Sequence, residues 1–285
     1  MKNADQQSEL QARTAEHYDR YPFEFMTPSD ESAIRATQPE PFRRFVDQYV
    51  TATSRVAEIG CGPGRGTLFL LDKTAHLIAV DISYRSLVMA RQRTPYTAFI
   101  RATNLMLPFQ SDSFDVVISD GVIHHTPDAR QAFGENARIA AVGGTLYIGV
   151  YNRKRYYYYF YTVLGPLLQR LERNIAGRAF IYATALPLYW LVHLVKSGGK
   201  RTWKGAINFF YDYIMTPRAS FHTYEEVCIW GREEGLDLLA YDPSLGNVHV
   251  FVFRKTRRTR TEVISAYSQG DSDADHFKAN LHELD

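Results

Sequence analysis

The chain has 285 residues and a mass of 32.7 kDa, which fits one elaborated globular domain and excludes a peptide. Hydrophobic residues make up 45% of it and charged residues 22%, so a sizeable core can form and global disorder is excluded. The net charge is +2, and the two cysteines, Cys61 and Cys228, are too few for a disulfide framework or a structural zinc site.

Residues 1–16 are polar and do not resemble a secretory signal, so we expect a cytoplasmic protein. No run reaches about 18 apolar residues, and an obligatory membrane span is therefore not expected. Prolines at positions 22, 28, 39 and 41 interrupt the first 53 residues, which predicts a helical segment with two helices between the breaks.

From residue 54 onward, short apolar runs alternate with amphipathic segments. The predicted strands are 55–60, 76–82, 97–101, 114–119 and 145–150. The predicted helices are 67–72, 128–141, and a segment running to Arg93 with Ser83 as its N-cap. Strands and helices that alternate in this way predict a parallel sheet covered on both faces.

The alternation stops at residue 151, where an insert of different composition begins. Between residues 151 and 205 there are ten Lys or Arg and one acid, Glu172, and residues 156–161 read Tyr-Tyr-Tyr-Tyr-Phe-Tyr. Residues 179–195 are mainly apolar and have basic flanks. Such a segment can pack on the domain, contact a membrane surface or contact nucleic acid. The apolar runs argue against nucleic acid, because a surface that binds phosphates is polar.

Regularity returns at Thr223 and Glu226, whose spacing predicts a capping box and a helix to about residue 234. Residues 236–241 and 249–254 are predicted to form an antiparallel pair of strands. The predicted organisation is a helical segment 1–53, a half domain 54–150, a helical insert 151–221, a completing segment 222–255 and a mobile polar tail 256–285.

A glycine-rich turn follows the first predicted strand. Gly60, Gly62 and Gly64 stand at alternate positions, which lets a ligand approach the backbone amides closely. The third glycine of a dinucleotide fingerprint is missing, which argues against a nicotinamide cofactor. Asp81 ends the next strand about 20 residues later, where a carboxylate can accept both hydroxyls of a ribose.

Five segments in fixed order carry a resemblance to a known family. They are Glu58-Ile-Gly-Cys-Gly-Pro-Gly64, Val80-Asp81, the stretch 107–117, Val122-Ile-His-His-Thr-Pro-Asp128 and Val142-Gly-Gly-Thr-Leu146. Across residues 54–150 the chain resembles the class I S-adenosylmethionine-dependent methyltransferases, in particular those similar to type 11. The resemblance implies an α/β fold, with a Rossmann-like seven-stranded sheet in which the last strand is antiparallel, and helices on both faces.

The resemblance also implies S-adenosylmethionine as the cofactor, with the glycines around its methionine part and Asp81 at its ribose. The family often has an acid before the Leu-Pro-Phe segment to receive the adenine amino group, where this chain has Thr103 and Asn104, so we expect an altered adenine contact. The predicted cofactor-binding residues are Glu58, Gly60, Cys61, Gly62, Gly64, Asp81, Ile82, Thr103, Asn104, Leu105 and Asp120.

Methyl transfer from a sulfonium is an in-line displacement, which needs alignment, dry surroundings and a nucleophile with a free lone pair. The predicted catalytic residues follow strands at the carboxyl edge of the sheet: Asp120, His124 and Tyr151. His124 and His125 either take a proton from the acceptor or pack against the next helix. In the N-terminal segment, Tyr18 and Tyr21 either line the site or fix that segment to the core.

We expect transfer to a small-molecule or lipid-like acceptor, with peripheral membrane contact through residues 151–205 and with nucleic acid not expected as a partner. The alternatives are an RNA or protein methyltransferase and a protein that binds S-adenosylmethionine without turnover. The sequence predicts no oligomeric state and no metal site.

Overall fold

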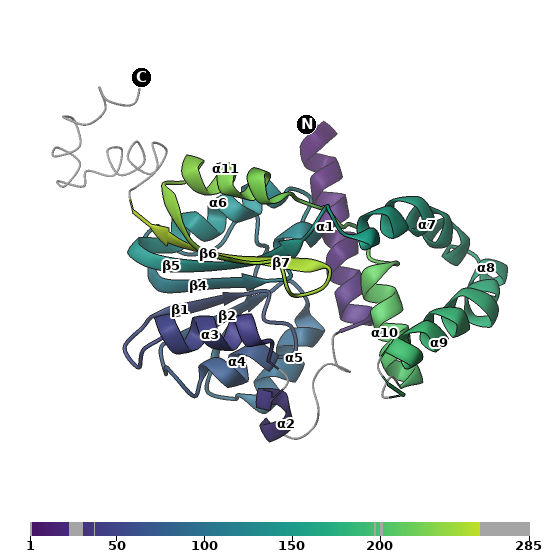
Figure 1. Ribbon diagram of the computed structural model, residues 1–285, viewed down its shortest axis with the longest axis horizontal. Coiled ribbons are helices and arrows are strands. Elements are labelled where there is room, and N and C mark those ends of the chain that lie inside the picture. Colours follow the sequence, from purple (N-terminus) through teal and green to yellow (C-terminus); the bar gives the residue numbers. More distant parts are fainter. Residues whose placement is uncertain (1, 23–30, 37, 197, 200–201, 257–285) are drawn as a thin grey trace.

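The computed structural model describes residues 2–22, 31–36, 38–196, 198–199 and 202–256. Its centre is a seven-stranded sheet of order β3-β2-β1-β4-β5-β7-β6, with helices on both faces (Figure 1). Strands β1 to β5 are parallel, and β7 is antiparallel to both β5 and β6. The predicted fold, including the antiparallel last strand, is confirmed. The strands are β1 Val56–Ile59, β2 Leu77–Asp81, β3 Ala98–Arg101, β4 Phe114–Asp120, β5 Ala140–Tyr151, β6 Leu236–Asp242 and β7 Val248–Lys255.

Two apolar clusters hold helices against the two faces of the sheet (Figure 1). On one face, Phe133 of α6 and Trp230 of α11 pack with residues of β4, β5 and β7. On the other face, Phe42 and Phe45 of α3 pack around Tyr147 of β5. The helices of these two layers are α3 Glu40–Tyr49, α4 Arg65–Leu70, α5 Tyr84–Arg93, α6 Ala129–Ile139 and α11 Tyr224–Glu233.

The predicted helix starts have the expected caps. Ser83 accepts a hydrogen bond from the Ser86 amide, and Thr223 and Glu226 form the predicted capping box. The fifth strand differs from the prediction, because it begins at Ala140 and not at residue 145. The pairing of β4 with β5 shifts in register between Phe114 and Val116, which accommodates the residues of β5 before position 145. An irregularity of this kind interrupts the alternation of apolar and polar residues, so the sequence does not reveal where the strand begins.

The N-terminal segment forms three helices where two were predicted: α1 Lys2–Arg20, the short α2 Glu31–Ala36, and α3. Helix α1 stands across the carboxyl ends of the central strands (Figure 1). Asp19 anchors it, because the Asp19 carboxylate accepts hydrogen bonds from the Ser83 hydroxyl at 2.7 Å and from the Arg85 amide at 3.1 Å. The start of α5 therefore fixes the lower end of α1 over this edge of the sheet.

Residues 156–213 of the insert are largely helical: α7 Tyr156–Glu172, α8 Ile175–Phe180, the π-helical turn η3 Ile181–Ala185, α9 Leu186–Lys196 and α10 Trp203–Tyr213. The insert projects from the sheet beside α1 (Figure 1). The elements from α8 to α9 form one helix, Ile175–Val195, whose 21 residues and mean hydropathy of 1.3 would permit a membrane crossing by length and composition alone. The helix extends past the apolar run 179–195 to include Ile175 and Arg178. Length and composition alone do not make it a span, and the expectation of no obligatory membrane span stays a prediction. Nearly all of the predicted mobile tail lies outside the described residues.

Candidate active site

A cavity of about 490 Å³ lies at the carboxyl edge of the sheet, enclosed by the glycine-rich turn on one side and by α1 and α10 on the other. It brings together most of the predicted site residues, which come from segments more than 90 positions apart in the sequence. The predicted residues that line it are Glu58, Gly60, Cys61, Gly62, Asp81, Ile82, Thr103, Asn104, Asp120, His124 and Tyr151. Gly64 and Leu105 do not line the cavity.

The glycines of the turn have different physical roles. Gly60 has a φ of +78°, and a Cβ there would overlap the side chain of Val122. Gly62 has a φ of +54° and faces open space, so nothing blocks a ligand from its backbone. Gly64, also predicted to bind cofactor, allows α4 to approach α5, because a Cβ there would lie 3.0 Å from the Cβ of Ala90. Leu105, likewise predicted, is part of the apolar core.

Asp81 is held by backbone amides at the end of β2. Its carboxylate oxygens accept hydrogen bonds from the Gly62 amide and from the Ser83 amide, each at 2.8 Å. Burial raises the pKa of Asp81 to about 6, against the effect of these amides. The carboxylate is therefore mostly ionised at neutral pH, and each oxygen keeps a lone pair for a further donor. A pair of ribose hydroxyls fits these acceptors.

Glu58 lies deeper in the same wall, at the end of β1. It accepts a hydrogen bond of 2.5 Å from the Thr67 hydroxyl, and Gly66 leaves room for its carboxyl group. Burial raises the pKa of Glu58 to about 8, so the group is largely protonated at neutral pH and can itself donate a hydrogen bond. A neutral donor beside the open backbone at Gly62 suits the carboxylate end of an amino-acid ligand.

Asn104 lines the part of the cavity where the resemblance places adenine, but its side chain is already engaged. Its amide oxygen accepts a hydrogen bond of 2.7 Å from Asn136, and its amide nitrogen lies 3.5 Å from the Ser119 hydroxyl. The neighbouring Thr103 hydroxyl accepts a hydrogen bond from the Leu105 amide. The amide of Asn104 is thus fixed in one orientation, with one lone pair of its oxygen available to a ligand.

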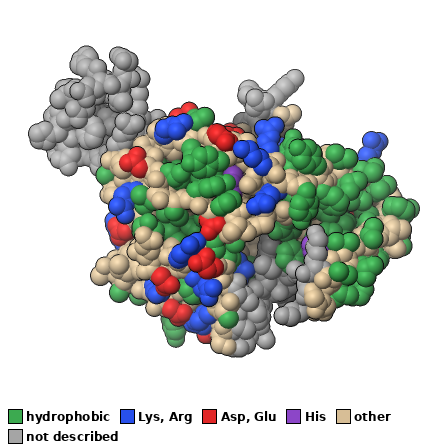
Figure 2. Space-filling view, in the orientation of Figure 1, with side chains coloured by type: hydrophobic (Ala, Val, Ile, Leu, Met, Phe, Trp, Pro, Cys, Tyr) green, Lys and Arg blue, Asp and Glu red, His purple; other side chains and the backbone are tan. Residues whose placement is uncertain are grey.

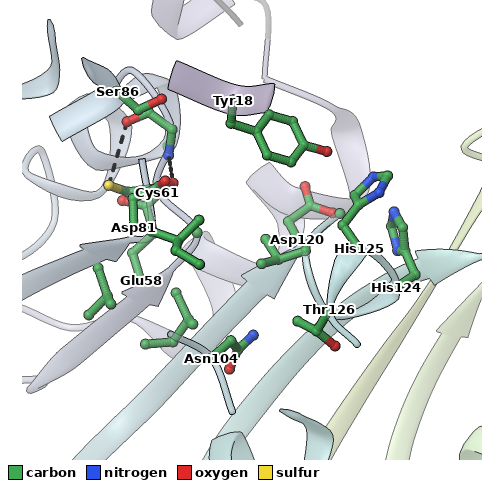
Figure 3. A pocket seen from close by; sticks show the side chains of 18 of the residues that line it. Tyr18, Glu58, Cys61, Asp81, Ser86, Asn104, Asp120, His124, His125 and Thr126 are labelled. Atoms are coloured by element: carbon green, nitrogen blue, oxygen red, sulfur yellow. Dashed lines mark hydrogen bonds between the residues drawn. The ribbon is translucent and has the colours of Figure 1, made fainter. Parts of the chain in front are cut away.

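Asp120 ends β4, and His124 and His125 follow it, at the opposite end of the cavity from Asp81 (Figure 3). Burial raises the pKa of Asp120. His124 stacks on Tyr151 with ring centres 3.7 Å apart, and burial holds its pKa well below 6.5. Within the described part of the chain, neither ring nitrogen of His124 has a hydrogen-bond partner, and both are sealed from solvent. Its geometry favours the packing interpretation over proton transfer.

His125 has a defined tautomer. Its Nδ1 lies 2.8 Å from the carbonyl oxygen of Arg218, so Nδ1 carries the proton and Nε2 keeps a lone pair. Burial lowers the pKa of His125 to about 4, and the ring is neutral at physiological pH. The ring meets Tyr18 of α1 edge to face at 5.8 Å, which places α1 directly over this end of the cavity.

Tyr151 and the N-terminal tyrosines occupy different positions. Tyr151 is enclosed by other rings, and burial raises the pKa of its hydroxyl well above 10, so it stays protonated. Tyr18 lines the cavity, whereas Tyr21 stacks on Tyr211 of α10 at 4.0 Å and fixes α1 to the insert. Of the two roles considered for the N-terminal tyrosines, lining the site applies to Tyr18 and fixing the segment in place applies to Tyr21.

Sequence reasoning missed Asp212, a buried carboxylate on α10 that lines the cavity. It accepts a hydrogen bond of 3.4 Å from the hydroxyl of Tyr18, and burial raises its pKa to about 8. A signal was present, because Asp212 is a lone acid inside the apolar stretch Phe-Phe-Tyr-Asp-Tyr-Ile, and an unpaired charge rarely enters an apolar helix without a role. Asp212 thus joins Asp120 and His125 as a titratable group in the lining of the cavity.

Comparison with known proteins finds a family match for the part of the chain from β1 to β5, which includes the glycine-rich turn. Residues 57–148, about a third of the chain, match the family described as a methyltransferase domain. The probable tRNA methyltransferase 9B of Mus musculus is 39% identical over 101 residues, which cover 34% of this chain and 22% of that protein. The malonyl-[acyl-carrier protein] O-methyltransferase of Legionella pneumophila is 29% identical over 120 residues, covering 40% and 38%. The matched segments thus span less than half the length of either relative.

Among solved structures, a SAM-dependent methyltransferase of Thermotoga maritima, described as a possible histamine N-methyltransferase, has a similar fold. Its TM-score is 0.50 at 19% identity, and the alignment covers 84% of this chain and 99% of that one. At this identity the likeness concerns the fold alone.

Proposed function

We propose, given that residues 57–148 form a class I S-adenosylmethionine-dependent methyltransferase domain, that the chain methylates a small, lipid-like acceptor held between this domain and helices α1 and α10. One observation carries the proposal. The cavity that begins at the glycine-rich turn ends against side chains of α1 and α10, so that its far end is closed by segments outside the family match. The near end suits the cofactor, and the far end suits an acceptor.

The residues at the near end fit S-adenosylmethionine. Asp81 offers carboxylate oxygens to the ribose, Glu58 offers a neutral carboxyl group to the amino-acid part, and the backbone at Gly62 is open. When bound there, S-adenosylmethionine supplies an electrophilic methyl group on a positively charged sulfur. The buried walls exclude water from the point of transfer, which strengthens the electrostatic contacts inside.

The far end provides groups that bind an acceptor and receive its proton. The Asp212 carboxylate, when ionised, accepts the proton that an acceptor hydroxyl or amine loses as its lone pair forms the new bond to carbon. The lone pair on Nε2 of His125 accepts a hydrogen bond and orients the acceptor. Because the pKa of Asp212 is about 8, only a minor fraction of the carboxylate is ionised at neutral pH, and this fraction rises with pH through about 8.

Enclosure supports a small acceptor over a polymer. Tyr18 of α1 and Phe209 and Tyr213 of α10 line the far end of the cavity, and the hydrogen bonds of Asp19 anchor α1 across it. A nucleotide within an RNA or a side chain within a folded protein would require α1 to leave this position. The aromatic lining favours an apolar acceptor with one polar, methylatable group.

To test this, the chain is incubated with S-adenosylmethionine labelled in its methyl group and with one fraction of a cell extract at a time. The fractions are organic-solvent-soluble lipids, polar metabolites, RNA and protein. We expect label in the lipid fraction, and we expect Asp212→Asn to lower the transfer while leaving cofactor affinity nearly unchanged. Asp237→Asn, an exposed carboxylate on β6, is the matched control and should behave like the unchanged chain. Label confined to RNA or protein contradicts the proposed acceptor class, and no transfer to any fraction despite tight cofactor binding contradicts turnover.

A further inference from the structure

Helix α7 is apolar on two opposite sides. Tyr157, Gly165 and Leu168 are buried against the rest of the molecule. The opposite side carries a second stripe at helical spacing, Tyr156, Tyr159, Val163 and Leu167, with Val163 70% exposed. A surface helix of a water-soluble protein normally has a polar outer face. The outer face of α7 is therefore built for contact with something other than water.

Helix α9 repeats the arrangement. Leu188, Leu191, Val192 and Val195 follow one another at spacings of three, one and three residues and form a single exposed stripe, with Val195 75% exposed. Figure 2 shows that hydrophobic side chains cover most of the visible surface of this end of the molecule. Because several helices contribute, the patch is broader than the scattered apolar residues that an ordinary protein surface exposes.

The charges of the insert indicate what covers this surface. Arg170, Arg173 and Arg178 are exposed where α7 turns into α8, next to the apolar stripes. Residues 151–205 contain ten Lys or Arg and one acid. Apolar and aromatic side chains combined with basic ones match a bilayer whose surface carries anionic headgroups. A second copy of the chain fits less well, since pairing would bring the arginines of both copies together with almost no acid to neutralise them.

We propose that the face formed by the exposed stripes of α7 and α9 binds to the surface of an anionic lipid bilayer, with the arginines between α7 and α8 on the headgroups. The contact is interfacial, not spanning. Ile181 and Leu186 are fully buried and pack with Phe210 of α10 and with its neighbours. A crossing by the helix Ile175–Val195 would pull both residues out of this cluster and expose its other members to water.

Binding in this orientation would bring α10 close to the membrane, and α10 carries Phe209 and Asp212 into the far end of the cavity. A lipid-like acceptor could then reach the cavity without passing through bulk water. The inference goes beyond the proposed methyl transfer and is tested without turnover, so its failure would leave the proposed reaction standing.

The experiment is co-sedimentation of the full chain with vesicles of phosphatidylcholine alone and of phosphatidylcholine mixed with phosphatidylglycerol, at low and high salt. We expect binding to the mixed vesicles that weakens as salt rises. The double variant Leu167→Gln/Leu191→Gln should bind about tenfold or more weakly for each leucine, because each loses its burial in the bilayer. Arg170→Gln and Arg173→Gln should each weaken binding about fivefold on the anionic vesicles and hardly change it on neutral ones.

Exposed matched positions serve as controls. Met106→Gln, at an exposed apolar side chain of the sheet domain, and Arg91→Gln, at an exposed base on α5, should leave vesicle binding unchanged. Circular dichroism establishes that each variant is folded. Absence of vesicle binding by the unchanged chain overturns the proposal. So does a concentration-dependent dimer in sedimentation velocity that the leucine variant disrupts, because a second copy would then cover the surface. Resistance to extraction by alkaline carbonate overturns the interfacial geometry in favour of a span.

Discussion

Replacing Asp212 with Asn separates the stability of the fold from its proposed chemistry. The side chain is 6% exposed, and asparagine has nearly the same shape. The oxygen of the asparagine amide can still accept the hydrogen bond from the Tyr18 hydroxyl. The substitution therefore removes a titratable group and leaves the packing of α1 on α10 unchanged.

The pKa sets the sign and size of the effect on stability. Burial raises the pKa of Asp212 from 3.8 to about 8, so between these values the folded chain holds a proton that the unfolded chain releases. The free energy of unfolding is therefore unaffected by this group below pH 3.8 and falls as pH rises towards about 8. With about 1.4 kcal/mol for each pKa unit, the loss reaches at most about 4 kcal/mol at pH 7. The Asp212→Asn variant should be more stable than the unchanged chain by up to that amount.

The measurement is denaturant unfolding of both chains at several pH values between 4 and 8. The difference in free energy of unfolding should be near zero at pH 4 and should grow with pH, while methyl transfer by the variant should be lower throughout the range. A group that costs stability and supports activity is what a functional site often contains. Asp237→Asn should show neither effect, because this carboxylate is exposed on β6.

Two results would refute this reasoning. If the two chains differ by the same free energy at every pH, Asp212 does not hold a proton in the folded state. If the variant transfers methyl groups as fast as the unchanged chain at saturating cofactor, Asp212 does not receive the acceptor's proton, whatever its effect on stability.

Three further substitutions test the rest of the site. Asp81→Ala should weaken S-adenosylmethionine binding by about 1.5–3 kcal/mol in titration calorimetry. In the unchanged chain, the affinity should fall as the pH drops below about 6, where Asp81 takes up a proton. If the variant binds the cofactor as tightly as the unchanged chain, Asp81 is not part of the cofactor site. Gly60→Ala should lower the free energy of unfolding by more than about 1 kcal/mol, because its φ is positive and its Cβ would overlap Val122; an unchanged thermal midpoint contradicts this. His124→Phe should keep the stack on Tyr151 and near-normal turnover, whereas a large loss of turnover would assign His124 a role in proton transfer.

The positions of the strands along the chain could be predicted because each strand contains a short apolar run, and the starts of α5 and α11 because Ser83 and Thr223 cap them. Gly60, Gly62 and Asp81 could be placed at the cavity for a similar reason, since the turn and the strand end that position them are local in the sequence. The start of β5 was missed because the bulge between β4 and β5 depends on pairing across the sheet. The start of the helix Ile175–Val195 was not predicted, because it depends on the N-cap at Asn174, which lies before the apolar run.

The acceptor end of the site was harder to predict, because it depends on contacts between distant segments. Tyr18 and Asp212 are 194 positions apart, and only the folded chain brings the phenol to the carboxylate. The family match ends at residue 148, before the insert, and begins after α1. Under the proposed function, residues 57–148 therefore contribute the cofactor end of the cavity together with Asp120, His124 and His125, whereas α1 and α10, outside the match, close the acceptor end. Relatives named for tRNA and for malonyl-[acyl-carrier protein] accordingly resemble this chain in the shared part, and under the proposed function α1 and α10 select the acceptor.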